Sequence, residues 1–166
     1  MISLLVGNIA SGKSTFSSLA ALHGSIIVND DDIVNMIHGG NYTLYSEHLK
    51  PLYKSIENHI VGISIALGKN VVIDRPNVTR LSRQRYIGLA ASLDVPVNAI
   101  VFPFSHPTEH ADRRFYSDNR NKTLRSWQET ANRLSMTYEP ISEDEGFTKI
   151  INVVDLDNIS EIIGKL

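Results

Sequence analysis

Short runs of apolar residues alternate with longer helical segments along this chain. The runs rich in Ile and Val predict five β-strands, at residues 2–6, 25–28, 70–73, 97–102 and 149–153. Because these runs are continuously apolar, the strands are expected to be buried on both faces. Strands that alternate with helices are typical of a parallel sheet covered by helices, so the pattern predicts an α/β fold.

Helical periodicity fills the segments between the strands and predicts helices at 13–22, 33–37, 46–67, 80–93 and 159–166. In the longest of these, apolar residues recur at spacings of three and four, at Leu49, Tyr53, Ile56, Ile60, Ile63 and Leu67. In 80–93 the positions expected to face the core are Leu81, Tyr86, Leu89 and Ala90. The span 109–134 is helical in composition but polar and basic, which predicts a surface lid at about 106–135.

Size and composition limit the class of protein. The chain has 166 residues, 42% of them apolar and 20% charged, which predicts one globular domain over 1–166. It contains no cysteine, so disulfides and thiolate metal sites are excluded. No apolar run is long enough to cross a bilayer, and the N-terminus lacks the charged start of a signal peptide. These features indicate a cytoplasmic protein.

A phosphate-binding loop follows the first predicted strand. Residues 7–14 match the pattern G-x-x-x-x-G-K-[ST], with an apolar strand before them and a helix after them. In such a loop the glycines allow successive N–H groups to turn towards phosphate oxygens, and the helix N-terminus adds partial positive charge. The residues expected to bind the nucleotide, ATP, are therefore Gly7, Asn8, Ile9, Ala10, Ser11, Gly12, Lys13, Ser14 and Thr15.

Three side chains near this loop are expected to serve the chemistry of phosphoryl transfer. Lys13 should reach the β- and γ-phosphate oxygens, and the Ser14 hydroxyl is suited to bind Mg²⁺. Asp74 follows the apolar strand 70–73, at the sheet edge where ligands bind in doubly wound folds. It is therefore predicted to hold Mg²⁺ together with Ser14, although an Asp at this place could instead cap the next helix.

Three consecutive carboxylates, Asp30, Asp31 and Asp32, follow the second predicted strand and should face the same crevice. A kinase needs a proton acceptor beside the attacking hydroxyl. We assign that catalytic role to Asp31 and assign Asp32 as the N-cap of the short helix at 33–37. The sequence alone does not decide which of these neighbouring carboxylates is the general base, so Asp30 remains an alternative to Asp31 in that role.

The charge is unevenly distributed. The net charge of −2 and the pI near 6.3 give no global reason to expect nucleic-acid binding. However, nine of the 16 Lys and Arg residues lie in two short windows: Arg75, Arg80, Arg83, Arg85, Arg113, Arg114, Arg120, Lys122 and Arg125. These windows are either solvated helix faces or, beside a phosphate-binding loop, partners for phosphate charge.

The histidines and the single tryptophan do not define a second site. His106 and His110 have the spacing of helical metal ligands, but Pro107 intervenes and no acidic third ligand is suitably placed. Trp127 could stack on a base, although a lone Trp in a helical segment more often packs in a core.

Several segments together resemble the kinase domain of polynucleotide kinases, which phosphorylate 5′-hydroxyl ends of DNA and RNA. The similar segments are the phosphate-binding loop continued to Phe16, then 28–31, 72–77, Ser82-Arg83-Gln84-Arg85-Tyr86, Tyr138-Glu139-Pro140 and Glu145-Gly146-Phe147. The resemblance implies ATP and Mg²⁺ as cofactors, Asp31 as the general base, and Arg113, Arg114 and Arg120 as lid arginines. Two positions depart from the family: Asp30 and Val34 stand where members, in the second case phage members, have Arg.

The sequence thus predicts a P-loop kinase that transfers the γ-phosphate of ATP to a hydroxyl of a nucleic acid, in the first place its 5′ end. Lys13, Asp31, Arg114 and Arg120 are the expected catalytic residues. One alternative is a kinase of a nucleoside, a nucleotide or another small hydroxyl compound. Others are a kinase of hydroxymethylated bases in phage DNA and a P-loop switch ATPase.

Overall fold

A computed structural model describes residues 1–117, 122–154 and 156–164 of the chain. Its centre is one five-stranded sheet in which every pairing is parallel. The spatial order of the strands is β2-β3-β1-β4-β5. Their bounds are Ile2–Val6 (β1), Ile26–Val28 (β2), Val71–Ile73 (β3), Val97–Val101 (β4) and Lys149–Asn152 (β5). The predicted α/β fold with a parallel sheet is confirmed.

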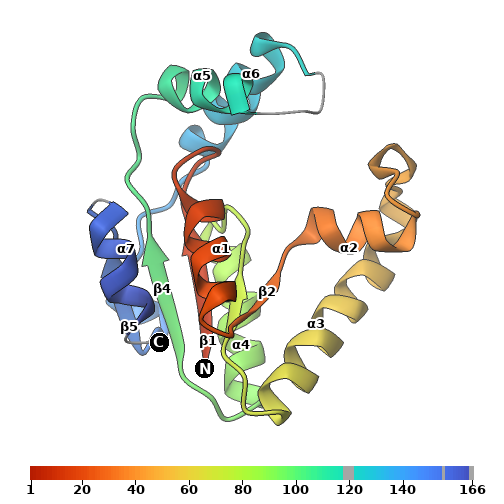
Figure 1. Ribbon diagram of the computed structural model, residues 1–166, viewed down its shortest axis with the longest axis vertical. Helices are drawn as coiled ribbons and strands as arrows, with labels where there is room; N and C mark the ends of the chain where they lie inside the picture. The colour runs from red at the N-terminus through yellow and green to blue at the C-terminus, as the bar shows by residue number, and fades with distance from the viewer. Residues whose placement is uncertain (118–121, 155, 165–166) are drawn as a thin grey trace.

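Helices cover both faces of this sheet (Figure 1). Their bounds are Lys13–Leu22 (α1), Asp30–Ile37 (α2), Lys50–Ala66 (α3), Arg80–Ser92 (α4), Pro107–Ser117 (α5), Leu124–Met136 (α6) and Leu156–Ile163 (α7). Short 3₁₀ turns lie at Tyr42–Leu44 (η1), Glu47–Leu49 (η2) and Glu143–Glu145 (η3). Among the described residues, no helix is long and apolar enough to cross a membrane.

The two faces of β1 bury neighbouring residues in different cores, as the two-residue period of a strand requires. Leu4 packs in the core that includes residues of α2, α3 and α4, whereas Leu5 packs in the core that includes residues of α1 and α7. Both side chains are fully buried. This double burial explains why the strand is apolar throughout.

Some positions predicted to face the core do not. Leu81 is 84% exposed, and at the end of α3 Ile63 and Leu67 are 50% and 71% exposed. On α4 the buried side chains are Arg83, Tyr86 and Ala90. The spacing of apolar residues gave a wrong prediction here because buried charged side chains occupy part of the inward face of each helix. These are Glu57 on α3 and Arg83 on α4, and both have partners elsewhere in the chain.

The single helical span predicted at 109–134 is two helices, α5 and α6, which pack on each other. Pro107 begins α5, where its missing N–H costs no hydrogen bond, and Thr123 caps α6 by accepting from the Ser126 N–H at 3.2 Å. Ala111, Trp127 and Ala131 form a small core between them. Figure 1 shows this pair beyond the carboxyl ends of the strands, over the loop that follows β1.

Candidate active site

The loop after β1 has the tight geometry of a phosphate-binding loop. Gly12, the N-cap of α1, has a left-handed φ of 103°, which glycine adopts without strain. At Gly7 a Cβ would lie 2.7 Å from Ser11 Oγ and 3.0 Å from Phe102 Cβ, so a larger residue would force these side chains to shift. Gly12 is therefore favoured by its backbone conformation and Gly7 by the closeness of these two side chains.

Lys13 lies inside this loop. Its Nζ donates to the carbonyl oxygen of Gly7 at 3.0 Å, to that of Asn8, and to Ser11 Oγ at 3.3 Å. Burial lowers the pKa of Lys13 to about 8; Asp74 opposes this shift and Arg114 adds to it. The ammonium group is thus held in a place where an additional anion would stabilise its charge.

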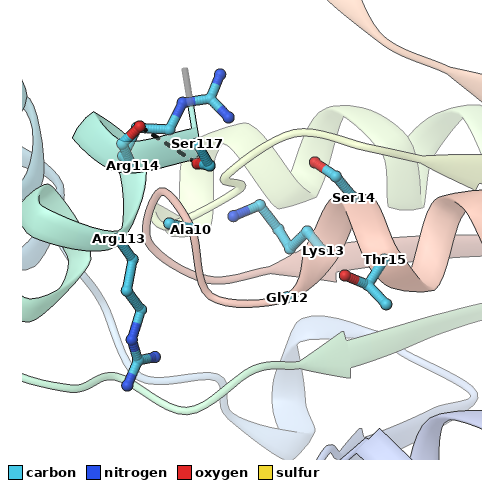
Figure 2. A pocket seen from close by; sticks show the side chains of 8 residues that line it. All are labelled: Ala10, Gly12, Lys13, Ser14, Thr15, Arg113, Arg114 and Ser117. Atoms are coloured by element: carbon cyan, nitrogen blue, oxygen red, sulfur yellow. Dashed lines mark hydrogen bonds between the residues drawn. The ribbon is translucent and has the colours of Figure 1, made fainter.

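A pocket of about 410 Å³ opens beside Lys13 (Figure 2). The loop and the start of α1 form one wall, and α5 forms the other. The lining residues are Ala10, Gly12, Lys13, Ser14, Thr15, Arg113, Arg114 and Ser117. Three of these side chains are cationic, so the pocket is electrostatically suited to an anion such as a polyphosphate. Arg120, the third predicted lid arginine, lies outside the described residues.

Asp74 lies at the carboxyl end of β3, as predicted. Its N–H donates to the carbonyl oxygen of Val28 at 2.9 Å, and its own carbonyl accepts from Asn29 Nδ2 at 3.0 Å. Burial raises the pKa of the Asp74 carboxyl, and the charges of Asp32 and Asp31 raise it further, while Ser17 and Lys13 act in the opposite direction. The fold therefore brings Asp74 within electrostatic reach of both Lys13 and the acidic segment.

The Ser14 hydroxyl and the carboxylates around Asp74 are oxygen donors of the kind that a magnesium ion binds together with phosphate and water. Ser14 lines the pocket, and the mutual repulsion of Asp31, Asp32 and Asp74 would be reduced by a divalent cation. Within the described part of the chain, no three His, Asp or Glu side chains form a ligand set of their own. Mg²⁺ in nucleotide sites commonly uses only one or two protein ligands beside phosphate oxygens.

The cap of α2 differs from the prediction. Asn29 is the N-cap, and its side chain accepts from the Asp31 N–H at 2.8 Å. Asp32 lies within the first helical turn, so its assignment as the cap is wrong. The helix begins three residues earlier than predicted because Asn29 has the extended backbone and the acceptor that a cap needs. All three carboxylates then lie near the positive end of the helix dipole.

Asp30 is joined to an ion-pair network rather than to the pocket. Its Oδ2 lies 2.5 Å from Arg75 Nη2, and Arg75 Nη1 donates to Tyr86 Oη at 2.9 Å. Arg75 and Arg85 both approach the buried Glu57 carboxylate, at 3.7 and 2.7 Å, and Tyr86 donates to the same side chain. Burial raises the pKa of Asp30, although Arg75 opposes that shift.

The other two arginines of this window also have carboxylate partners. Arg83 is fully buried and makes two charge-assisted hydrogen bonds to Glu145, both at 2.7 Å. Arg80 donates to Asp144 at 2.9 Å on the surface. The window 75–85 is therefore largely a structural ion-pair region. Its arginines are paired with carboxylates within the chain, whereas one interpretation of the sequence had them as partners for phosphate charge.

Sequence reasoning missed Glu57, and it missed the contacts of Asn8 with α6, since it expected Asn8 only to bind the nucleotide. Asn8, within the loop, donates to the carbonyl oxygen of Ala131 at 3.0 Å and to Ser135 Oγ at 2.9 Å, so it joins the loop to α6. Glu57 lies on the buried side of α3, four residues after Tyr53. The sequence did hold a signal for Glu57, because a charged residue stands there at a core position of a helix. It held no signal for the contacts of Asn8, because its partner Ala131 is over 120 residues away in the chain.

The chain belongs to a known protein family, the one described as an AAA domain. A family model described as an AAA domain matches residues 2–140. No curated protein sequence matches the chain. Together with the strand order and the loop, the family match defines a P-loop domain of the kinase type.

Solved structures share the fold at low sequence identity. The APS kinase CysC of Mycobacterium tuberculosis, in complex with AMPPNP and APS, has a TM-score of 0.65 and 11% identity, over 98% of this chain and 95% of that one. Kti12 of Chaetomium thermophilum, in complex with ADP-AlF3, has a TM-score of 0.63 and 13% identity, over 99% and 96%. A chain of the Pnkp1/Rnl/Hen1 RNA repair complex has a TM-score of 0.63 and 22% identity, over 89% of this chain but only 49% of that one.

Proposed function

We propose that this protein is an ATP-dependent kinase that transfers the γ-phosphate to a hydroxyl of a nucleic acid, in the first place a 5′-hydroxyl end. The observation that carries the proposal is the meeting of opposite charges at one sheet edge. The cationic pocket includes Lys13 of the loop, Asp74 acts electrostatically on Lys13, and Asp31 acts in turn on Asp74. Phosphoryl transfer to a hydroxyl needs both an anion site and a nearby proton acceptor.

The nucleotide would be held by the loop. Its N–H groups and Lys13 would bind the β- and γ-phosphates, and Ser14 with Asp74 would hold Mg²⁺, which neutralises phosphate charge when bound. Arg113 and Arg114 line the pocket from α5, so the α5–α6 pair would act as a lid. Together with Arg120 they would stabilise charge on the transferring phosphoryl group.

Asp31 would act as the general base. As the acceptor oxygen forms its bond to the γ-phosphorus, the bond to the β-phosphate oxygen breaks and ADP leaves. Asp31 takes the proton of the acceptor hydroxyl. Asp30 is less suited to this role, because its carboxylate is bound to the Arg75 guanidinium.

A nucleic-acid acceptor is supported by the family resemblance, whose segments contact one another in the fold. Arg83 of the Ser-Arg-x-Arg-Tyr segment pairs with Glu145 of the Glu-Gly-Phe segment. Asn77 donates to the carbonyl oxygen of Leu5 at 2.9 Å and so joins the segment after β3 to the strand that carries the loop. An RNA repair protein among the solved structures adds to this support.

A second candidate is a kinase of a small hydroxyl compound. The carboxylate partners of Arg75, Arg80, Arg83 and Arg85 favour it, because these arginines are then less available to bind the phosphates of a nucleic-acid strand.

The deciding experiment supplies γ-labelled ATP and Mg²⁺ with a panel of acceptors. The panel holds 5′-hydroxyl DNA and RNA oligonucleotides, the same strands blocked at the 5′ end, and the matching nucleosides. We expect label on the 5′-hydroxyl strands above all. Faster labelling of nucleosides would instead support the second candidate, and label within blocked strands would indicate a hydroxyl on a base. ATP hydrolysis that no acceptor changes would indicate a switch ATPase.

A further inference from the structure

Trp127 contacts a cation of the pocket lining, Arg114, but is not itself among the lining residues. The Arg114 guanidinium carbon is 5.2 Å from the centre of the Trp127 ring, and Lys122 Nζ is 4.7 Å from it. Both distances are within the range of a cation–π interaction. Of the two cations, Arg114 also lines the phosphate pocket. The ring therefore contacts the side chain of a residue that lines the pocket.

The ring is itself fixed relative to the phosphate-binding loop. Trp127 is buried between α5 and α6, and Ile9 of the loop packs against the same small core. On the next turns of α6, the Ala131 carbonyl and the Ser135 hydroxyl accept from the Asn8 side chain. A continuous set of contacts thus runs from the loop through α6 to Trp127 and Arg114.

We propose that Trp127 is a positioning residue that holds the Arg114 guanidinium at the phosphate pocket, so that loop and lid arginine form one preassembled unit. This inference rests on the proposed kinase function for its kinetic consequence. An arginine side chain has many rotamers, and holding it in place beforehand reduces the entropy lost when it binds a phosphoryl group. A buried aromatic face does this without competing for the guanidinium N–H donors.

The aromatic face, rather than the indole N–H, is the feature that matters. The Trp127 Nε1 is buried and, within the described part of the chain, has no hydrogen-bond partner. Trp127→Phe therefore loses no such bond and keeps a π face, whereas Trp127→Leu keeps apolar packing and removes the π face. This pair of variants separates positioning from packing.

The kinetic test is a double-mutant cycle between Trp127 and Arg114. Trp127→Leu should lower kcat for phosphoryl transfer about 10-fold, with little change in the KM for ATP, and Trp127→Phe should restore most of that loss. In an Arg114→Ala background, Trp127→Leu should have no further effect on kcat. Additive losses, or a Trp127→Phe protein as slow as Trp127→Leu, would overturn the proposal.

Leu134→Ala is the packing control, because it removes another buried apolar side chain from α6. It should lower the Tm while it leaves kcat near the wild-type value. If it lowers kcat as much as Trp127→Leu does, the lid responds to any loss of packing and the positioning role is wrong.

A spectroscopic test needs no substitution of Trp127 and no acceptor. Trp127 is the single tryptophan of the chain, so its emission reports on this ring alone. A non-hydrolysable ATP analogue with Mg²⁺ should change that emission in the wild type and in Lys122→Ala, but not in an Arg114→Ala protein shown by calorimetry to bind the analogue. An equal change in Arg114→Ala, or none in the wild type, overturns the proposal even where phosphoryl transfer is intact.

Discussion

Lys13 combines a charge that the proposed reaction needs with a burial that disfavours charge. Its three acceptors all belong to the loop, and its pKa is lowered to about 8. Bound phosphates would favour the charged form and raise that pKa. Above pH 8 the free protein must therefore take up a proton when it binds ATP.

The first prediction is that ATP affinity weakens as the pH rises above about 8. Well above that pKa, the Kd should increase about tenfold for each pH unit, because binding then requires one proton. Calorimetry between pH 7 and 9.5, in buffers of different ionisation enthalpy, measures both the Kd and the proton uptake. Lys13→Arg is the control, since arginine stays charged, and whatever affinity it retains should not change with pH. A wild-type Kd that is constant up to pH 9.5 would contradict the assignment.

The second prediction concerns the base. Asp31→Asn keeps the shape of the side chain but cannot accept the hydroxyl proton, so kcat should fall about 10²- to 10⁴-fold while ATP affinity changes little. Asp30→Asn is the matched control, because it removes a neighbouring carboxylate that is bound to Arg75. We expect it to weaken the fold more than it slows the chemistry, as steady-state kinetics and thermal melts would show. The reverse pattern would move the base to Asp30.

At the scale of elements, one buried ion pair connects α4 to the segment between α6 and β5. Arg83 and Glu145 bind through two hydrogen bonds, and Arg83 also donates to the carbonyl oxygens of Asn77 and Val78. Burial acts to raise the pKa of Glu145, but the hydrogen bonds from Arg83 and the Ser142 N–H, together with the charges of Arg83 and Arg80, outweigh it and the pKa is lowered. The pair therefore stabilises the fold above pH 4.5, and this contribution is lost as the pH falls below that value.

The third prediction is that Glu145→Ala destabilises the protein by about 3–5 kcal/mol, because it leaves the Arg83 charge buried without its partner. Urea denaturation at pH 7 measures the change in the free energy of unfolding. The double variant Arg83→Met with Glu145→Leu replaces the pair by apolar side chains and should recover most of the loss. A Glu145→Ala protein as stable as the wild type would show that water or another group compensates the arginine.

The elements show what a sequence can predict and what it cannot. β1, α1 and the loop between them have the predicted bounds because their signals are local: an apolar run, two glycines and a helix start. The cap of α2 was misplaced because Asn29 and Asp32 are both good caps and only the backbone decides between them. Leu81 was wrongly expected to face the core. Arg83 is buried on α4 instead, and its partner Glu145 lies 62 residues further along the chain, so no local pattern in the sequence could reveal this pairing.

At the scale of the whole molecule, the arginines fall into two groups with different partners. Those at 75–85 lie around α4 and pair with carboxylates of α2, α3 and η3. Arg113 and Arg114 lie on α5, beyond the strand ends, and line the pocket. The sequence could show both clusters, but only the fold separates an internal network from a ligand-facing wall.

This separation leads to the last prediction, on the binding of a nucleic-acid strand. Each phosphate that a protein neutralises on a single strand contributes about −0.7 to the slope of log K against log salt concentration. Ion pairs within the chain already engage Arg75, Arg80, Arg83, Arg85 and Arg125. We therefore expect at most about two phosphates to be engaged and a slope no steeper than about −1.4.

Fluorescence anisotropy of a labelled 5′-hydroxyl oligonucleotide, titrated between 50 and 300 mM salt, measures this slope. Arg75→Gln is the matched variant, because its guanidinium lies beside Asp30 and near the proposed acceptor side. If the Asp30 pair keeps Arg75 away from the strand, the variant should leave the slope unchanged. A slope near −3, reduced by about 0.7 in Arg75→Gln, would instead mean that a bound strand opens these ion pairs and draws their arginines to its phosphates.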